Sequence, residues 1–299
     1  MTTFKPITPE DKEVISSYIY LSPVQDSSCS FANLCCWQFL NESSYAIIDQ
    51  MLVLRFRFRN NGIMYSMPIG SKVSAAPKVI EQLKKETEGP FRLLGVYPDI
   101  REKLERYFYS YFTYHKSRDH FDYIYLRKNL AELNGMSYQA KRNHVNRFKR
   151  QYKYEYVPIT TELVPGCINF HDQWCEKHNC EEHESLSNEQ RALRFALKNF
   201  NELGLSGGAI IIDNEIVAFT YGAPINHNTF AIHVEKANTR IHGAYAMINQ
   251  EFASRIPEQY RFINREEDLG YPGLRKAKLS YYPYMLLEKC VAELTAEGL

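Results

Sequence analysis

The alternation of apolar and polar residues predicts a three-strand meander near the start of the chain. Residues 51–58 alternate large apolar side chains with arginine, which is the period of a half-buried strand. Flanking strands are expected at 45–50 and 63–69, and Asn60-Asn61-Gly62 is typical of a hairpin turn between two of them. The order continues with a helix over 75–88, a strand over 91–97 and a helix from Pro98. Residues 22–44, before the meander, are expected to form a long irregular loop.

The same order of elements recurs in the second half of the chain. Strands are expected at 208–212, 216–221 and 229–235, then a helix over 243–256, a strand around Phe262 and a final helix over 285–294. No residue-level repeat accompanies this order, so only the sequence of elements is duplicated. Helices over 137–153, 162–178 and 189–203, with a strand at 154–159, lie between the copies.

These patterns predict an α/β (α+β) protein with two similar domains, at residues 1–125 and 126–299. Each domain is expected to hold a mixed, mostly antiparallel sheet flanked by helices. The 299 residues are 44% hydrophobic and 24% charged, a composition typical of a soluble protein with a substantial core. The net charge of +1 provides no global attraction to nucleic acid, so any basic surface must be local.

Cysteine usage and hydropathy bear on the setting of the chain. Seven cysteines are an odd number, and the first residues contain no apolar signal segment. We therefore expect free thiols and a reduced, cytoplasmic location. No run approaches the roughly 18 apolar residues of a membrane-spanning helix, so no transmembrane segment is expected. The oligomeric state stays open.

The stretch 264–283 is dense in titratable groups. Three acids come first (Glu266, Glu267 and Asp268), and then Gly270, Pro272 and Gly273, which favour irregular structure. Three cations and two phenols follow, namely Arg275, Lys276, Lys278, Tyr281 and Tyr282. Loops on a rigid scaffold often carry chemistry. The alternative is a self-neutralising surface turn in which Glu267 and Asp268 pair with Arg275 or Lys278.

A second candidate site lies at 235–245, between a strand and a helix. The first turn of a helix carries free N–H groups, which bind phosphate well. Gly243 permits close approach of the backbone, and Arg240 and His242 can add donors. A single glycine is a weak motif, and a plain strand-to-helix connection would look similar.

A basic helix over 137–153 can supply further phosphate contacts. It carries Lys141, Arg142 and Arg147, and no acid occurs from Leu133 to Tyr154. A phosphate-rich partner such as tRNA would suit this face. The alternative is a solvated face of an amphipathic helix.

Histidines and cysteines between 171 and 183 have some of the spacing of metal ligands, but we expect no metal there. The set is His171, Cys175, His178, Cys180 and His183. It contains no CxxC pair, and the neighbouring Phe170 and Trp174 indicate a packed core. His233 is interpreted as a packed or hydrogen-bonded residue.

Two motifs suggest a family. A three-strand meander followed by an Arg-x-x-Gly turn into a helix resembles the acyl-CoA N-acyltransferase (GNAT-like) fold, whose turn grips the pyrophosphate of coenzyme A. Arg240 and Gly243 match that turn, whereas Tyr245 stands where a small residue is usual, which leaves room for another phosphorylated donor. With 141–149 and 264–281 added, nearly the whole chain resembles an uncharacterised bacterial family grouped with the C-terminal domain of phosphatidylglycerol lysyltransferase.

This resemblance implies two tandem GNAT-like domains, related to the peptidoglycan aminoacyltransferases that use charged tRNA. It implies transfer of an acyl group from acyl-CoA or aminoacyl-tRNA, as a donor substrate rather than a tightly bound cofactor, to an amine or hydroxyl. The acceptor would be a small molecule or a peptidoglycan- or lipid-like compound. The first domain lacks the Arg-x-x-Gly turn, so it is expected to bind no donor and to shape the acceptor cleft.

The resemblance also assigns candidate residues. Glu235, Glu267 and Asp268 are the candidate bases and Tyr281 is the candidate acid. The expected donor-binding residues are Val234, Lys236, Arg240, His242, Gly243, Ala244 and Tyr245, and the expected phosphate or substrate contacts are Lys141, Arg142, Arg147, Arg275 and Lys278. The competing hypothesis is a non-catalytic protein that binds a phosphorylated metabolite or nucleic acid on the same scaffold.

Overall fold

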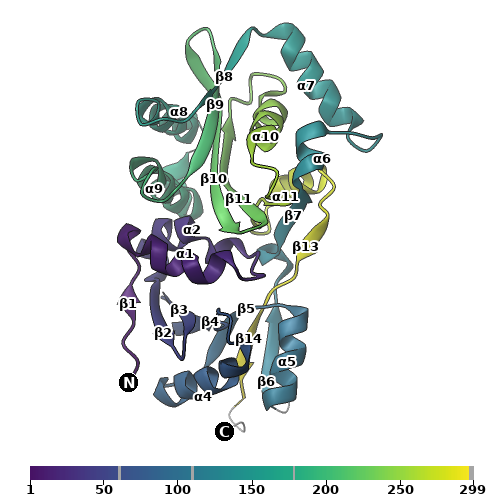
Figure 1. The fold of residues 1–299 in the computed structure, drawn as a ribbon. Helices are drawn as coiled ribbons and strands as arrows, with labels where there is room; N and C mark the ends of the chain where they lie inside the picture. The colour runs from purple at the N-terminus through teal and green to yellow at the C-terminus, as the bar shows by residue number, and fades with distance from the viewer. Residues whose placement is uncertain (60–61, 109–110, 178, 296–299) are drawn as a thin grey trace.

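The computed structural model describes residues 1–59, 62–108, 111–177 and 179–295, which form two seven-stranded sheets placed end to end (Figure 1). Both sheets are mixed and mostly antiparallel, and helices flank them, so the predicted fold class is confirmed. Asn60 and Asn61, part of the predicted hairpin turn, lie outside the described residues.

The first sheet contains the predicted meander. Its only parallel pair within the described chain is β4 with β5. In spatial order its strands are β1 (Lys5–Pro6), β2 (Ser44–Ile48), β3 (Met51–Phe58), β4 (Gly62–Ser66), β5 (Arg92–Val96), β14 (Cys290–Leu294) and β6 (Phe112–Lys116). Helices α4 (Ala76–Glu86) and α5 (Pro98–Phe108) pack against this sheet, and both were predicted from the sequence.

The second sheet has one parallel pair among its described strands, β11 with β12. In spatial order its strands are β13 (Met285–Leu287), β7 (Asp122–Leu126), β12 (Phe262–Asn264), β11 (Thr229–Ala237), β10 (Glu215–Asn226), β9 (Ser206–Ile212) and β8 (Tyr154–Pro158). Helices α8 (Val164–Lys177) and α9 (Glu184–Lys198) cover one face (Figure 1). Helices α6 (Arg127–Glu132), α7 (Gln139–Gln151) and α10 (Ala244–Arg255) lie on the opposite side.

The chain crosses between the sheets more than once. Strand β7 belongs to the second sheet, and the expected division between residues 125 and 126 falls within it. Strand β13 lies in the second sheet, and the chain then runs down to place β14 between β5 and β6 of the first (Figure 1). The C-terminal segment therefore ties the two sheets together.

The helix predicted over 285–294 is wrong, because this segment forms strands β13 and β14. A short apolar run has no period long enough to distinguish a strand from a helix. Here the open edges of β7 and of β5 and β6 provide backbone partners for an extended chain.

Two segments expected to be irregular are partly helical. Residues 22–44 contain α2 (Phe31–Cys36) and α3 (Gln38–Asn41), after α1 (Lys12–Tyr20). The stretch 264–283 contains α11 (Pro272–Leu279), in which Pro272 occupies the first turn. Proline is tolerated at that position because its missing N–H would have no helical partner there.

The two domains share a hydrophobic core. Ile15, Ile19 and Leu34 from α1 and α2 join one buried cluster with Leu193 of α9 and Tyr221 of β10. This shared packing fixes the N-terminal helices against the second sheet, between the two sheets in Figure 1. Within the described residues, no helix is both long and apolar enough to cross a bilayer.

Candidate active site

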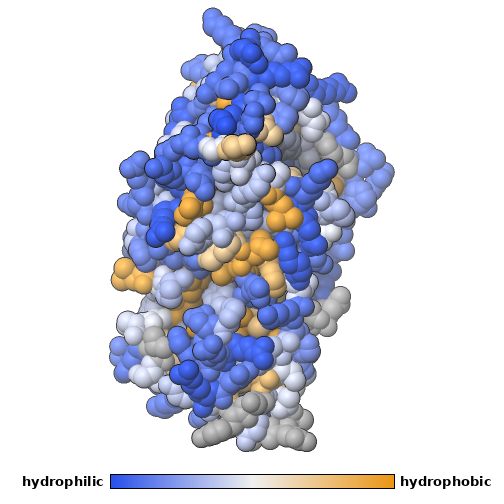
Figure 2. Space-filling view, turned by 90° about the vertical axis from the view of Figure 1, so that its right-hand side faces the viewer, coloured by the Kyte–Doolittle hydropathy of each residue, from blue (hydrophilic) through white to orange (hydrophobic). Residues whose placement is uncertain are grey.

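A cleft of about 1310 Å³ lies where the second sheet meets the N-terminal helices. Strand β12 pairs with only the beginning of β11, and the last pair is Ala231 with Asn264. Beyond this pair the two strands separate, and residues 232–236 of β11 line the cleft. The stretch 264–283 leaves β12 at the same point and supplies much of the opposite wall. Figure 2 shows hydrophobic side chains gathered at mid-height on one face of the molecule.

The start of α10 forms one end of the cleft. Gly243 has φ +85° and occupies the position before the first helical residue, so its backbone favours glycine. A Cβ at Gly243 would lie 2.7 Å from the backbone oxygen of His144, so the glycine also lets α10 pack directly on α7. His242 Nε2 lies 3.1 Å from His144 Nδ1, and both rings line the cleft. The uncapped start of α10 therefore faces a site with several nitrogen donors.

The structure brings some of the predicted donor and phosphate contacts to this end of the cleft and leaves others elsewhere. Those that line the cleft are Lys141, Val234, Lys236, His242, Gly243, Ala244, Tyr245 and Lys278. Arg240 is exposed and lies outside the lining residues. Arg142 instead donates to the backbone oxygens of Leu133 and Gly135, and Arg147 bonds Gln151 at 3.2 Å.

Glu235 lies in the cleft but is already engaged. One carboxylate oxygen accepts a hydrogen bond from Arg265 at 3.0 Å, and the other accepts one from Asn249 at 2.9 Å. Arg265 and Asn249 therefore occupy both oxygens of the Glu235 side chain. This geometry is that of an anchored anion that orients Arg265.

Glu267 is the acid in the cleft with the properties of a general base. Burial raises the pKa of its carboxyl to about 7, the nearby carboxylates of Asp122 and Glu266 add to the rise, and Lys289 opposes it. Lys289 is itself held at 2.8 Å by Asp26 and at 2.9 Å by Asp122. A carboxyl that titrates near neutral pH can both take and return a proton under physiological conditions.

Asp268 and Arg275 pair with each other away from the cleft. Asp268 is fully buried and accepts hydrogen bonds from Arg275 at 2.9 and 2.7 Å and from Tyr123 at 2.6 Å. These interactions, against the effect of burial, hold the pKa of Asp268 well below its usual range. Neither residue is among those described residues that line the cleft, so the geometry matches the self-neutralising alternative for this pair.

Tyr281 follows α11 and lines the cleft close to two cations. The ammonium of Lys141 lies 3.9 Å from the centre of its ring, and the guanidinium of Arg265 lies 4.8 Å from it. Burial raises the pKa of the Tyr281 phenol well above its usual value. The phenol therefore keeps its proton at neutral pH, which is the form required of an acid that protonates a leaving group.

Lys278 supports the backbone of the cleft wall. Its ammonium donates to the backbone oxygens of Arg265, at 2.5 Å, and of Glu267. Burial lowers the pKa of this amine. These contacts hold the backbone of Glu267, so Lys278 has a structural role, and its phosphate contact stays a prediction.

Sequence reasoning missed a polar cluster beside Glu267. Glu266 accepts hydrogen bonds from Asn33 at 2.8 Å and faces His233 Nδ1 at 2.8 Å, while His233 Nε2 lies 3.2 Å from Ser30 Oγ. Glu266 also has φ 58°, a left-handed conformation uncommon for a glutamate. The earlier interpretation of His233 as hydrogen-bonded matches this geometry. No local pattern could have paired Glu266 with Asn33, or His233 with Ser30, because Asn33 and Ser30 come from the distant N-terminal part of the chain.

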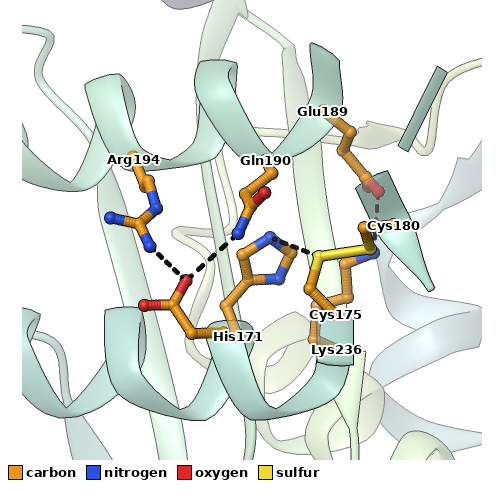
Figure 3. The surroundings of a disulfide bond; sticks show 8 residues. His171, Cys175, Cys180, Glu189, Gln190, Arg194 and Lys236 are labelled. Carbon is orange, nitrogen blue, oxygen red and sulfur yellow. Dashed lines mark hydrogen bonds and ion pairs between the residues drawn. A yellow bond between two sulfur atoms is a disulfide. The ribbon is translucent and has the colours of Figure 1, made fainter. Parts of the chain in front are cut away.

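A disulfide bond joins Cys175 at the end of α8 to Cys180, beside the cleft wall (Figure 3). The expectation of free thiols is therefore wrong for this pair, because the short turn after α8 brings the two sulfurs together. The other five cysteines are free and buried. His171 lies 3.7 Å from Cys175, and Lys236 is held by Glu189 at 2.9 Å (Figure 3). His178, part of the considered metal set, lies outside the described residues, and the part of the chain that is described contains no cluster suited to a metal ion.

A second part of the cleft, which we call the apolar arm, is lined by hydrophobic side chains. It is built from the N-terminal helices, from β3 and from α9, and its large side chains are Leu34, Trp37, Leu40, Phe56, Phe58 and Leu186. The cleft thus joins a polar, ionisable end on the second sheet to a hydrophobic end on the first domain. Such a site suits a ligand with both kinds of surface.

Comparison with known proteins defines the class to which this fold and cleft belong. The family model of the phosphatidylglycerol lysyltransferase C-terminal domain matches residues 21–293, and the chain belongs to that family. The two sheets are tandem GNAT-like domains. The family and fold are those of acyl- or aminoacyl-transferase-like proteins, and thus of a transferase in general.

Three individual proteins show how far the similarity extends. A conserved protein of unknown function from Bacteroides thetaiotaomicron is 48% identical, with a TM-score of 0.94 over 99% of this chain and 100% of that one. L-PGS from Bacillus licheniformis shares the fold at 15% identity, with a TM-score of 0.66 over 99% of this chain and 94% of that one. An uncharacterised protein from Mycoplasmoides gallisepticum is 24% identical over 170 residues, 56% of this chain and 54% of that protein. The match thus spans about half the length of this curated relative.

Proposed function

We propose that this protein transfers an acyl or aminoacyl group from a phosphorylated donor to an amine or hydroxyl acceptor, with Glu267 as the general base. The observation that carries the proposal is a cleft carboxyl with a pKa of about 7. A base is most effective when its pKa lies near the working pH, and a surface carboxylate near pKa 4 would be much weaker. Glu235 is neutralised by Arg265, and Asp268 by Arg275, which favours Glu267 among the three candidates.

The donor is proposed to bind with its phosphate at the start of α10. The N–H groups of that turn provide positive potential there, and the ring nitrogens of His144 and His242 are available for hydrogen bonds to a phosphate. Acyl-CoA and aminoacyl-tRNA both carry the required phosphate. The lysyltransferase name of the family favours the aminoacyl donor, and so does the exposed basic face of α7, where Lys149 and Arg150 border a shallow groove.

The reaction uses two proton transfers. Glu267 takes a proton from the acceptor ammonium or hydroxyl, and the freed lone pair forms a bond to the donor carbonyl carbon, whose oxygen becomes negative. That oxygen then re-forms the double bond, and the bond to the donor thiolate or ribose oxygen breaks. The leaving group takes the phenolic proton of Tyr281, and the nitrogen of an amine acceptor releases its second proton to solvent as the amide forms. Exchange with solvent then restores Glu267 and Tyr281.

The acceptor is proposed to occupy the apolar arm of the cleft. Trp37, Phe56 and Phe58 come from the first domain, which lacks the donor turn. An acceptor with a hydrophobic part, such as a lipid-like molecule, would bury that part here, and a small amine would leave the arm mostly empty. The first domain then shapes acceptor choice and the second holds the donor.

A donor panel followed by one substitution tests the proposal. Thermal-shift measurements with acetyl-CoA, longer acyl-CoA and lysyl-tRNA identify the donor, since a ligand that binds only the folded state stabilises it. Glu267→Gln should retain donor affinity and lose transfer, whereas Glu258→Gln, at an exposed side chain, should retain both. Donor binding without transfer by the wild-type protein, for every donor and a panel of amines and lipids, would favour the non-catalytic binding protein instead.

A further inference from the structure

Arg265 occupies the gap between the two parallel strands of the second sheet. It follows β12 directly, at the level where β11 and β12 stop pairing. Its side chain reaches Glu235, four residues beyond Ala231, which is the last β11 residue paired with β12. The guanidinium therefore lies in the opening between the two strands, where Arg265 forms part of the cleft wall.

The guanidinium of Arg265 is only partly satisfied. Its Nη2 atom donates to Glu235, but the Nη1 atom is buried and has no hydrogen-bond partner in the described part of the chain. The side chain as a whole is 11% exposed. A buried donor without a partner costs about 1–3 kcal/mol, and more when the group is charged. Because Arg265 is one of the residues that line the cleft, its unpartnered donor is suited to an incoming acceptor.

The charges around Arg265 do not balance. Glu235 supplies one negative charge, and its two oxygens are used by Arg265 and Asn249. Lys141 adds a second positive charge, and its ammonium lies over the face of the Tyr281 ring, 3.9 Å from the ring centre. Burial, followed by the nearby Arg265, lowers the pKa of Lys141, as expected for a cation that is short of counter-charge. Arg265, Lys141 and Glu235 together thus carry one net positive charge, which one further negative charge would neutralise.

We propose that Arg265 and Lys141 form an anion subsite between β11 and β12 that takes a small oxyanion. Resting on the proposed function, the subsite would hold the carbonyl oxygen that becomes negative when the acceptor attacks the donor. The electrons of the carbonyl double bond move to that oxygen as the new bond forms, and Arg265 Nη1 donates to it. Such pre-positioned donors commonly contribute about a hundredfold or more to the rate.

Binding of inorganic phosphate tests the subsite without turnover. Phosphate is titrated at constant ionic strength and followed by calorimetry. Three proteins are compared with the wild type: Lys141→Met, the double variant Arg265→Met/Glu235→Gln, which leaves no unpaired buried carboxylate, and Lys149→Met on the exposed face of α7. The first two should bind phosphate about tenfold more weakly, and Lys149→Met should match the wild type. Equal affinity in all four proteins would overturn the subsite.

Two further measurements separate the possible failures. If His242→Ala abolishes phosphate binding and the double variant keeps it, the ion sits at the start of α10 and the subsite is refuted. In a transfer assay, the double variant should be about a hundredfold slower than Glu235→Gln alone. Equal transfer rates would remove the oxyanion role and leave the proposed function standing. Phosphate binding that depends on Arg265, with no transfer from any donor, would uphold the subsite and overturn the proposed function.

Discussion

Arg275 donates two hydrogen bonds to Asp268, at 2.9 and 2.7 Å, and thereby closes the stretch 264–283 on itself. The same guanidinium donates to Asp119 at 2.6 Å, so it also ties this stretch to the segment before β7. The pair holds the chain between β12 and α11 in one conformation. Glu267 directly precedes Asp268 in the chain, so the Asp268–Arg275 pair helps to fix its position.

Asp268→Asn should lower the free energy of unfolding by about 1–3 kcal/mol, because a neutral amide cannot form the ion pair with Arg275, which keeps its bond to Asp119. Urea unfolding at pH 7 measures the change. Since the pKa of Asp268 is well below its unfolded value, the stabilisation is present above about pH 4 and is lost as the pH falls further. The loss on acidification should therefore be smaller in Asp268→Asn. Unchanged stability with abolished transfer would instead assign Asp268 to the chemistry.

Gly243→Ala should weaken donor binding and lower the stability by about 1–2 kcal/mol. The new Cβ would meet the backbone oxygen of His144 at 2.7 Å, and φ +85° is unfavourable for alanine. Gly273→Ala is the matched control, because its Cβ would meet nothing within 4 Å and it lies in α11. Thermal unfolding with and without donor measures both effects. Equal behaviour of the two variants would show that the tight packing of α10 on α7 does not matter.

Reduction of the Cys175–Cys180 bond should cost about 2 kcal/mol, as expected for a short closed loop. Differential scanning calorimetry with and without a thiol reductant should show the melting temperature falling by a few degrees. The double variant Cys175→Ser/Cys180→Ser should melt at the lower temperature and ignore the reductant. A wild-type protein that also ignores the reductant would show that this bond does not form in solution.

The fold was predictable where the pattern was regular and long. The strands that contain residues 54–58 and 229–235 follow a clear two-residue period there, and each has a hairpin partner directly adjacent in the chain. The prediction of a helix over 285–294 was wrong because the strands with which this segment pairs, β7, β5 and β6, lie far away in sequence. Helix α11 was not predicted because proline and glycine usually interrupt a helix, whereas Pro272 and Gly273 lie in its first turn, where both are tolerated.

The candidate site divides in the same way. The turn at Gly243 was identified because a glycine before a helix is a local signal. The residues that contact Glu266 and influence Glu267 could not be identified in this way. Asn33, which bonds Glu266, and Lys289, which lowers the pKa of Glu267, come from opposite ends of the chain. Arg265 was overlooked because the strand separation that exposes it depends on the register of β11 with β12. Such properties arise only from tertiary packing.

The pH dependence of single-turnover transfer, with the identified donor saturating, tests the role of Glu267 most directly. The base must be deprotonated, so the rate should rise about tenfold per pH unit below pH 7 and level off above it, with a midpoint at about pH 7. Glu267→Gln should be at least about a hundredfold slower and should lack this rise. A Glu267→Gln protein that keeps both the wild-type rate and the midpoint would contradict the account.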